Sequence, residues 1–347
     1  MLRRVGVLAV ATLVWLCATP GVVWAQPAPE AAHALVPPPA RPTEVAVAMH
    51  LVALTRVSPP NEPFPTFQAE LVLDARWNDP RLATEPPTVR RTYLGADVDR
   101  FERDHWWPDL ELDNVQGQRQ VEGRELIVSP DGSVTYLERF QATFTARVDL
   151  RRFPFDRQTL EVAVASLPWH EGDLRLRPLD ARPEVRAQGS NEWRVVAVRG
   201  DVSSHREVQA ERAFSRFVMR AEVERLPWFY LWKIAVPLLF VVMLGWSTFW
   251  MTGEAAPTRL QRAFIATLSV VAFHQVVSQN LPRIGYLTFL DGVVYLAFVS
   301  SGLSIVQIIA THHLGPERAG RLDRTCRWAF PLGFGLVLGG LWAFFHR

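Results

Sequence analysis

The spacing of hydrophobic and polar positions divides the chain into two parts, one with alternating positions and one with long apolar runs. Between residues 43 and 225 they follow a strand pattern, and residues 67–77 and 132–153 alternate most regularly. Turn signals such as Ser129-Pro130-Asp131-Gly132 separate the runs, and we find no helical periodicity between them. Many short strands with regular breaks predict an all-β, immunoglobulin-like sandwich over residues 44–225.

Long apolar runs take over after residue 225. Four of them cover about residues 226–251, 259–281, 287–311 and 328–345. Each is near the length that a helix needs to cross a bilayer, and a helix satisfies its own backbone hydrogen bonds in lipid. Residues 226–347 are therefore predicted to be an all-α, four-helix transmembrane domain.

The first 25 residues have the pattern of a secretory signal peptide. Arg3 and Arg4 precede a short apolar run, and Ala25 supplies the small residue before the expected cleavage site. An uncleaved anchor remains the alternative. Residues 26–43 are rich in Pro and Ala, which is typical of an extended tether. Without the signal, Cys326 is the single cysteine, so no internal disulfide is expected.

The signal and the loop charges predict the same topology. Export places the β domain outside, and four spans return the C-terminus to that side. The loop at residues 312–327 carries four arginines, as cytoplasmic loops do: Arg318, Arg321, Arg324 and Arg327. We therefore expect a multi-pass protein of the bacterial inner (plasma) membrane, with the β domain and the C-terminus on its periplasmic or extracellular side.

Composition and motifs argue against catalysis and nucleic-acid binding. The formal net charge is +2, and no basic cluster stands out in the first half of the chain. We find no glycine-rich phosphate loop, zinc-ligand spacing or nucleophile elbow. We expect no enzyme activity, no metal and no cofactor.

The second apolar run carries polar residues at helical spacing. One face, with offsets of four and three, consists of Gln261, Ile265, Leu268, Ala272, Gln275 and Gln279. A second polar stripe, Thr267, His274 and Ser278, is rotated by about 100°. Periodicity alone does not choose between them. A polar stripe in a membrane needs neighbouring subunits, so either choice predicts an oligomer. His274 is a candidate proton sensor or a neutral packing residue.

Five short motifs occur in a fixed order along the chain. They are Trp77-Asn78-Asp79-Pro80-Arg81-Leu82; Trp106-Trp107-Pro108-Asp109; Phe153-Pro154-Phe155-Asp156-Arg157-Gln158; Arg225-Leu226-Pro227; and Leu281-Pro282-Arg283. Together they resemble the pentameric ligand-gated ion channels, or Cys-loop receptors, over roughly residues 44–346. Ala146 and Leu160 stand where animal members have the loop cysteines, so the resemblance is to the prokaryotic form without that disulfide.

The resemblance implies a homopentamer in a lipid bilayer, with a pore lined by the Gln261–Leu268–Gln275 face. Leu268 would form an apolar gate, and inorganic ions would permeate. Pro257-Thr258-Arg259 is similar to the pattern of anion-selective members, so Arg259, with Glu254 nearby, is the expected selectivity element. The resemblance alone leaves cation selectivity open.

The resemblance also implies a coupling region and an agonist site. The coupling residues would be Asp79, Arg81, Phe153, Pro154, Phe155, Asp156, Arg225 and Pro282, with the loop at residues 282–288 as the receiver. The agonist, a small molecule or protons, would bind between subunits near Trp107, Glu111, Trp169, His170, His205 and Arg206. Val72 and Leu167 replace two aromatic residues of amine receptors, which favours a polar or acidic ligand.

Three other functions compete with this interpretation. The first is a membrane enzyme, but the sequence has none of the catalytic motifs named above. The second is a transporter, which would be expected to have more spans with internal repeats. A non-conducting, membrane-anchored binding receptor is the main alternative, although it would not need an amphipathic second span.

Overall fold

A computed structural model of the protein describes residues 36–57, 65–84, 89–179, 187–207, 212–251, 253–280 and 285–346. The predicted signal peptide and most of the tether lie outside these residues. So does the coupling candidate Pro282, and so do the side chains of His205, Arg206 and Gln279.

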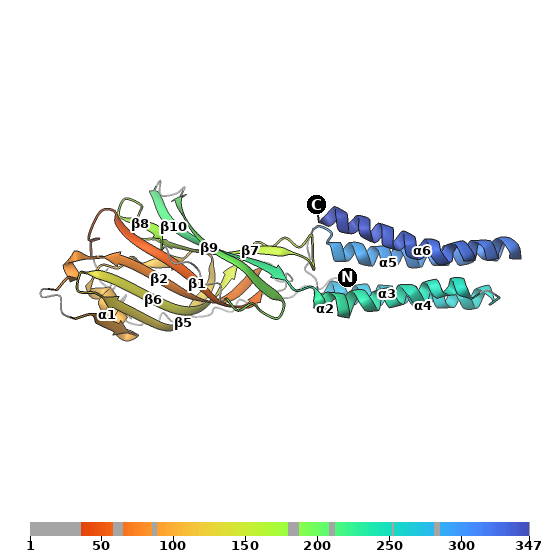
Figure 1. Ribbon diagram of the computed structural model, residues 1–347, viewed down its shortest axis with the longest axis horizontal. Helices are drawn as coiled ribbons and strands as arrows, with labels where there is room; N and C mark the ends of the chain where they lie inside the picture. The colour runs from red at the N-terminus through yellow and green to blue at the C-terminus, as the bar shows by residue number, and fades with distance from the viewer. Residues whose placement is uncertain are drawn as a thin grey trace, which may run out of the picture. The chain divides into compact units, whose positions relative to one another are not determined.

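Two β-sheets form the first part of the described chain (Figure 1). The strands are β1 (Thr43–Val57), β2 (Thr66–Asn78), β3 (Arg91–Leu94), β4 (Leu110–Leu112), β5 (Val115–Val128), β6 (Ser133–Thr145), β7 (Arg157–Ser166), β8 (Leu174–Pro178), β9 (Trp193–Glu207) and β10 (Arg212–Arg225). The larger sheet has the order β3-β5-β6-β2-β1-β8, and the smaller has the order β4-β7-β10-β9. The pairs are antiparallel except for β1 with β8. The predicted sandwich is confirmed.

Strand β6 illustrates how the sequence builds the sandwich. Every second residue from Val134 to Phe144 is buried, and the intervening side chains are more exposed. Because successive side chains of a strand point to opposite faces, this alternation places one face of the sheet in the core. One member of the buried face is charged: Glu138 is 1% exposed.

A short helix interrupts the strands, contrary to the expectation of an uninterrupted β pattern. Helix α1 (Ala96–Asp104) has two buried residues, Val98 and Phe101, and six charged ones. Two apolar positions three residues apart are too few to reveal a helical period in the sequence. Phe101 stacks on His105 and contacts Tyr93, which fixes the helix against β3.

Four helical segments follow, as predicted. The first runs through α2 (Trp228–Tyr230), a π-helical turn (Leu231–Ala235), α3 (Val236–Ser247) and a 3-10 turn (Thr248–Trp250). The others are α4 (Ala256–Asn280), α5 (Phe289–His313) and α6 (Pro316–Phe345). Helix α6 begins twelve residues before its apolar run, so the four arginines expected in a loop lie on its first turns.

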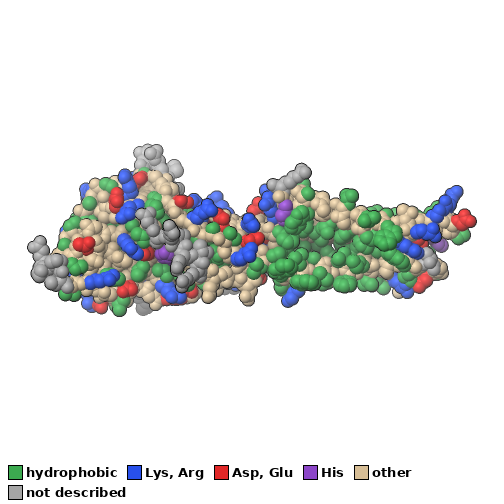
Figure 2. Space-filling view, viewed as in Figure 1, with side chains coloured by type: hydrophobic (Ala, Val, Ile, Leu, Met, Phe, Trp, Pro, Cys, Tyr) green, Lys and Arg blue, Asp and Glu red, His purple; other side chains and the backbone are tan. Residues whose placement is uncertain are grey.

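Three of these segments are long and apolar enough to cross a membrane: residues 228–250, 289–313 and 316–345. Helix α4 is more polar than α3 and α5. Figure 2 shows apolar side chains over the middle of the helical part, with basic side chains gathered toward both of its ends. A band bounded by charge in this way is typical of a membrane-spanning domain.

The helices share one core. Leu238, Val242, Trp246 and Phe249 of the first segment pack with residues of α4, α5 and α6. The Trp246 indole N–H donates to Ser300 Oγ at 2.9 Å, so its polar atom is satisfied inside the bundle.

Candidate functional site

A buried ion pair lies where the last strand meets the first span. Arg225 ends β10, and its Nε donates to Asp156 Oδ1 at 2.7 Å. Asp156 is 1% exposed and Arg225 is 8% exposed. The guanidinium also lies over the rings of Trp193 and Phe153, 4.1 and 4.9 Å from their centroids. Charges removed from water need such partners, so this pair fixes the loop between β6 and β7 (residues 146–156, the signature loop) to the end of β10.

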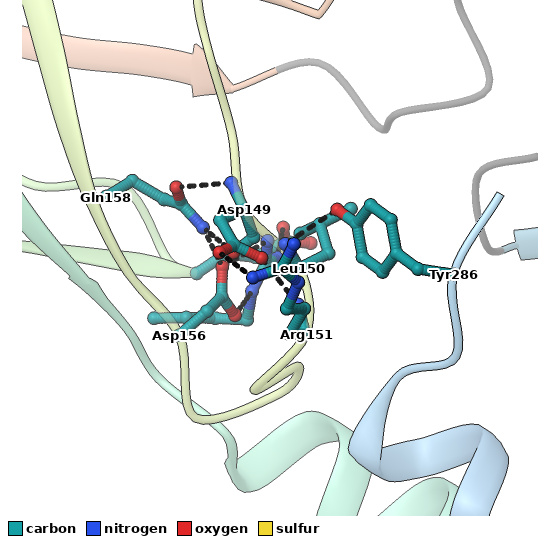
Figure 3. Close-up of polar contacts among 8 residues, drawn as sticks. Asp149, Leu150, Arg151, Asp156, Gln158 and Tyr286 are labelled. Carbon is teal, nitrogen blue, oxygen red and sulfur yellow. Dashed lines mark hydrogen bonds and ion pairs between the residues drawn. The ribbon is translucent and has the colours of Figure 1, made fainter. Parts of the chain in front are cut away.

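A hydrogen-bond network extends this pair to the helices (Figure 3). The Gln158 side-chain amide donates to Asp156 Oδ2 at 2.7 Å and to the Asp149 carbonyl at 2.6 Å. On the same loop, the Leu150 backbone N–H donates to the Tyr286 hydroxyl at 3.1 Å. Tyr286 belongs to the loop that we expected to receive the signal. The sequence offered no signal for this contact, because its partners are 136 residues apart.

The aromatic residues of the signature loop contact three helices. The Phe155 ring lies 6.0 Å from Phe289 of α5 and 4.8 Å from Trp342 of α6. The Phe153 ring lies 4.6 Å from Tyr230 of α2. Rings at these distances and near-perpendicular angles pack favourably. The loop is thus joined to the first, third and fourth helical segments.

Two predicted coupling residues, Asp79 and Arg81, lie away from this junction. Asp79 and Arg81 follow the end of β2, where Asn78 pairs with Ser133 at the start of β6. The signature loop follows the opposite end of β6, about 40 Å away along a strand of this length. Arg81 folds back onto Asp79, donating at 2.8 and 2.7 Å. The pair stabilises a turn and does not reach Asp156.

The predicted pore face of α4 is turned away from the protomer's own core. Its opposite face, Arg259, Ala263, Ala266 and Val270, is buried. The candidates Gln261, Ile265, Leu268, Ala272 and Gln275 are all exposed, Leu268 by 66%. The centres of the two faces, near Ala266 and Leu268, are about 200° apart on the helix. This face is therefore available to neighbouring subunits or to a water-filled path.

The alternative polar stripe lies between these two faces. The Thr267 hydroxyl donates to the Ala263 carbonyl of its own helix at 2.9 Å. The His274 ring lies 6.0 Å from that of Tyr295 on α5 and within 3.4 Å of Ser278 Oγ. Contacts inside the protomer thus satisfy Thr267 and His274, and they leave the Gln261–Leu268–Gln275 face as the free one.

The selectivity candidates differ in their surroundings. Arg259 is 7% exposed, and its Nη2 donates to Asp323 Oδ1 of α6 at 2.8 Å. Gln307 of α5 donates to the same oxygen at 2.6 Å. Glu254 is exposed and pairs with Arg262 at 3.6 Å. The Arg259 charge is therefore neutralised inside the bundle, and this geometry does not support a ring of free Arg259 side chains around the pore.

The buried Arg259–Asp323 pair is expected to stabilise the folded protein. Asp323→Asn leaves a buried guanidinium without a counter-charge, which costs about 3–5 kcal/mol when one partner of such a pair is removed. We expect a clearly lower melting temperature and less assembled protein, measured in detergent by thermal unfolding and size-exclusion chromatography. The matched control is Glu317→Gln, the same chemical change at an exposed position of α6. Equal melting temperatures for the two variants would contradict the assigned pair.

Two predicted agonist-site residues lie together. The Trp169 indole N–H donates to the Trp107 carbonyl at 2.9 Å, and the Trp107 ring packs edge-on against Tyr136. Glu111 is exposed on β4, and its strand pairs with β7. His170 Nε2 lies 3.0 Å from Asp173 in the turn before β8. The structure therefore brings Trp107 and Trp169 into contact, whereas His170 pairs with Asp173 and Glu111 lies on an exposed strand position.

Sequence reasoning missed a group of carboxyls beside these tryptophans. Buried Glu138 accepts a hydrogen bond from the Tyr136 hydroxyl at 2.7 Å and pairs with Arg119 at 2.9 Å. Burial raises the pKa of Glu102, and the nearby Asp109 and Glu138 charges raise that pKa further. Burial also raises the pKa of Asp109, against the effect of Arg119. Because these side chains are scattered over α1, the next loop and β6, no sequence spacing marks the group.

A shallow cavity of about 300 Å³ lies on the larger sheet. Its lining includes Val72, Leu94, Leu137, Arg124 and Arg139. Arg139 is held by Glu70 and Glu122, and Arg124 by Asp99. The cavity therefore offers guanidinium groups beside apolar surface, at the position where amine receptors carry an aromatic residue.

Comparison with known proteins agrees with this architecture. Residues 33–224, more than half of the chain, match the neurotransmitter-gated ion-channel ligand binding domain family. The chain is 29% identical to a proton-gated ion channel of Gloeobacter violaceus over 90% of this chain and 87% of that one. It is 26% identical to the rat gamma-aminobutyric acid receptor subunit rho-1 and 25% identical to human rho-2. These matches cover 78% of this chain but 58% and 59% of the two receptor subunits.

The family match over the sandwich and the presence of four helical segments after it indicate the same family. The chain belongs to the neurotransmitter-gated, or Cys-loop-type, family and is a subunit of a ligand-gated ion channel.

Proposed function

We propose that five copies of this chain form a homopentameric channel in a bacterial inner membrane, with the β-sandwich outside and α4 around the pore. One observation carries the proposal: the polar and apolar candidates on α4 face away from the protomer's core. A helix that exposes glutamines in a membrane needs water or partner subunits on that face. Leu268, midway along the stripe, would form a ring that excludes water from the closed pore.

The signature loop is the proposed link between ligand and gate. It is joined to β10 through Asp156–Arg225 and to the helices through Tyr286, Phe289 and Trp342. A buried charge-assisted pair has few alternative arrangements, so a change in the sandwich would move the loop as a unit. That movement would reach the first, third and fourth helices together.

External acid is the proposed stimulus. Its support is the group formed by Glu102, Asp109 and Glu138, together with the likeness to a proton-gated relative. A carboxyl whose pKa is raised in the folded protein favours its neutral form. Its stabilising contribution is complete at low pH and is lost as pH rises through the raised pKa. Mild acid would therefore neutralise Glu102 and Asp109 before it neutralised ordinary exposed carboxyls.

Glu102→Gln tests the acid stimulus. The amide imitates the protonated side chain, so we expect the pH of half-activation to move upward by about 0.5–1 unit. The measurement is the current as a function of external pH. Asp97→Asn, an exposed carboxyl on the same helix, is the control and should leave the curve in place. A downward shift, or equal shifts in both variants, would contradict this role.

The proposal as a whole is tested by recording current from the expressed or reconstituted protein during steps of external pH. We propose a preference for anions, based on the positive N-terminal ends of five α4 helices and the Gln261 amides at the inner mouth. Reversal potentials in asymmetric salt measure that preference, and values that follow the cation would contradict it. Silence from oligomers shown to be at the surface would favour the non-conducting receptor.

A small carboxylate or zwitterion is the second candidate agonist. The cavity beside Val72 supports it, because Arg124 and Arg139 line it; a ligand carboxylate would share these guanidinium groups with Asp99, Glu70 and Glu122. The two rho subunits named above are receptors for gamma-aminobutyric acid, a ligand of this chemistry. Amino acids applied at constant neutral pH test this candidate, since any current they evoke is independent of external acid.

A further inference from the structure

A histidine at the end of α6 lies among aromatic rings. The His346 ring stacks on Trp342, with centroids 3.8 Å apart and planes inclined by 15°. The rings of Phe155 in the signature loop and Phe289 of α5 lie 5.9 and 6.0 Å from it. Trp342 contacts the same two phenylalanines at 4.8 and 5.6 Å. His346 is therefore part of the contact that joins the end of α6 to the signature loop.

The two ring nitrogens of His346 have different surroundings. Nδ1 lies 3.0 Å from the Trp342 carbonyl oxygen. Because a carbonyl oxygen can only accept, we assign a proton to Nδ1, which donates to it. Nε2 is buried and has no hydrogen-bond partner among the described residues. The neutral ring thus has one satisfied nitrogen and one unpaired lone pair.

A second proton, on Nε2, would make the ring a cation in a place that favours positive charge. The indole face under the ring is negative, so it attracts a stacked imidazolium. The Nδ1–H group bonds one of the last carbonyls of α6, where the helix dipole favours a cation. Both interactions hold the last turn of α6 in the conformation that places Trp342 against Phe155.

The charged groups on the elements around His346 are paired elsewhere or exposed. Those of the signature loop are Arg147, Asp149, Arg151, Arg152 and Asp156. Asp156 binds Arg225, and the other four are exposed, where water and salt screen them. On α5, Asp291 caps its own helix at Thr288. Residues 339–345 of α6 carry no charge. Within the described chain, these elements therefore offer His346 rings and a carbonyl group.

We propose that protonation of His346 strengthens the contact between the end of α6 and the signature loop, so that acid holds the fourth helix more firmly against Phe155 and Phe289. Histidine is the side chain that changes charge between pH 5 and 8. The contact is therefore tightest in acid and loosens as the pH rises. It is separate from the carboxyls of the sandwich, and it uses the proposed topology only for the access of external acid to this end of the helices.

Hydrogen–deuterium exchange of the purified full-length oligomer tests this, read by mass spectrometry on the last turn of α6 at about pH 5.5 and about pH 7.5. After correction for intrinsic rates, the wild-type amides are expected to be about 3- to 10-fold better protected in acid. His346→Phe retains a ring without a proton site, so its protection should not depend on pH. His346→Arg stacks on Trp342 and is charged at both pH values, so it should be well protected at both.

The matched control is His313→Phe, the same change at an exposed position at the other end of α5, which should retain the wild-type pH dependence. The first turns of α6 are the internal reference, since a general effect of acid on the fold would change their protection too. Equal protection of the wild-type last turn at the two pH values would overturn the proposal, as would a wild-type pH dependence in His346→Phe. Exchange in detergent is read without current, so these outcomes are independent of whether acid opens the channel.

Discussion

Replacing Asp156 by asparagine is expected to suppress acid-evoked current at least about tenfold. Because Arg225 keeps Glu192 at 4.0 Å and the Trp193 ring at 4.1 Å as partners, oligomers are expected to remain at the membrane. The amide has no charge to offer Arg225. It also has only one acceptor oxygen for the two donors Gln158 Nε2 and Arg225 Nε, so its NH₂ group faces one of them donor to donor. A loss of even about 1.4 kcal/mol between the two states of the junction shifts the open–closed equilibrium tenfold.

The measurement is the pH–current curve, with surface labelling and size-exclusion chromatography of the same variant. Asp149→Asn is the matched control, because Asp149 lies in the same loop with an exposed carboxylate. Arg225→Lys separates charge from geometry, since lysine retains the charge but cannot reproduce the planar guanidinium. A normal response of Asp156→Asn would remove the pair from the proposed gating path.

Replacing Leu268 by serine is expected to open the channel at pH values where the wild type is closed. In the proposed pentamer one substitution changes five side chains of the apolar ring. If each leucine contributes only about 0.5 kcal/mol to excluding water, well below the ~1.5–3 kcal/mol for burying such a side chain, five contribute about 2.5 kcal/mol. That corresponds to a shift of roughly 60-fold in the open–closed equilibrium.

The experiment compares leak current at neutral pH and the pH of half-activation. Leu336→Ser is the control, because Leu336 is at least as exposed but lies on the outward face of α6. An increase confined to Leu268→Ser would identify the pore face. Equal behaviour of the two variants would point instead to a general loosening of the helices, and Thr267→Ala on the neighbouring stripe would then be the next variant to record.

The chain's local patterns were enough to predict its architecture. Alternation in β6 and its neighbours predicted the sandwich, and the run lengths after residue 225 predicted the four helical segments. Helix α1 was missed because Val98 and Phe101 alone do not make a period. The start of α6 was placed too late because its first turns are charged, and charge marks a membrane boundary more clearly than a helix boundary.

The sequence did not predict which distant side chains pair with one another. The sequence suggested Arg259 as a free pore charge, whereas its partner Asp323 lies 64 residues away on another helix. It also grouped Asp79 and Arg81 with Asp156, although strand pairing places them at opposite ends of β6. The sequence pointed to both residues of the Asp156–Arg225 pair. It did not predict that the pair is buried, or that Trp193 and Gln158 contact it.

What the sequence determined by itself was the division into an exposed sandwich and a membrane domain, and the two candidate stripes of α4. Both follow from periodicity, which is a local property of the chain. The tertiary structure decided which stripe is free, which charges are neutralised and which carboxyls have raised pKa values. Those properties depend on groups far apart in the sequence, because burial and Coulomb interactions act through space.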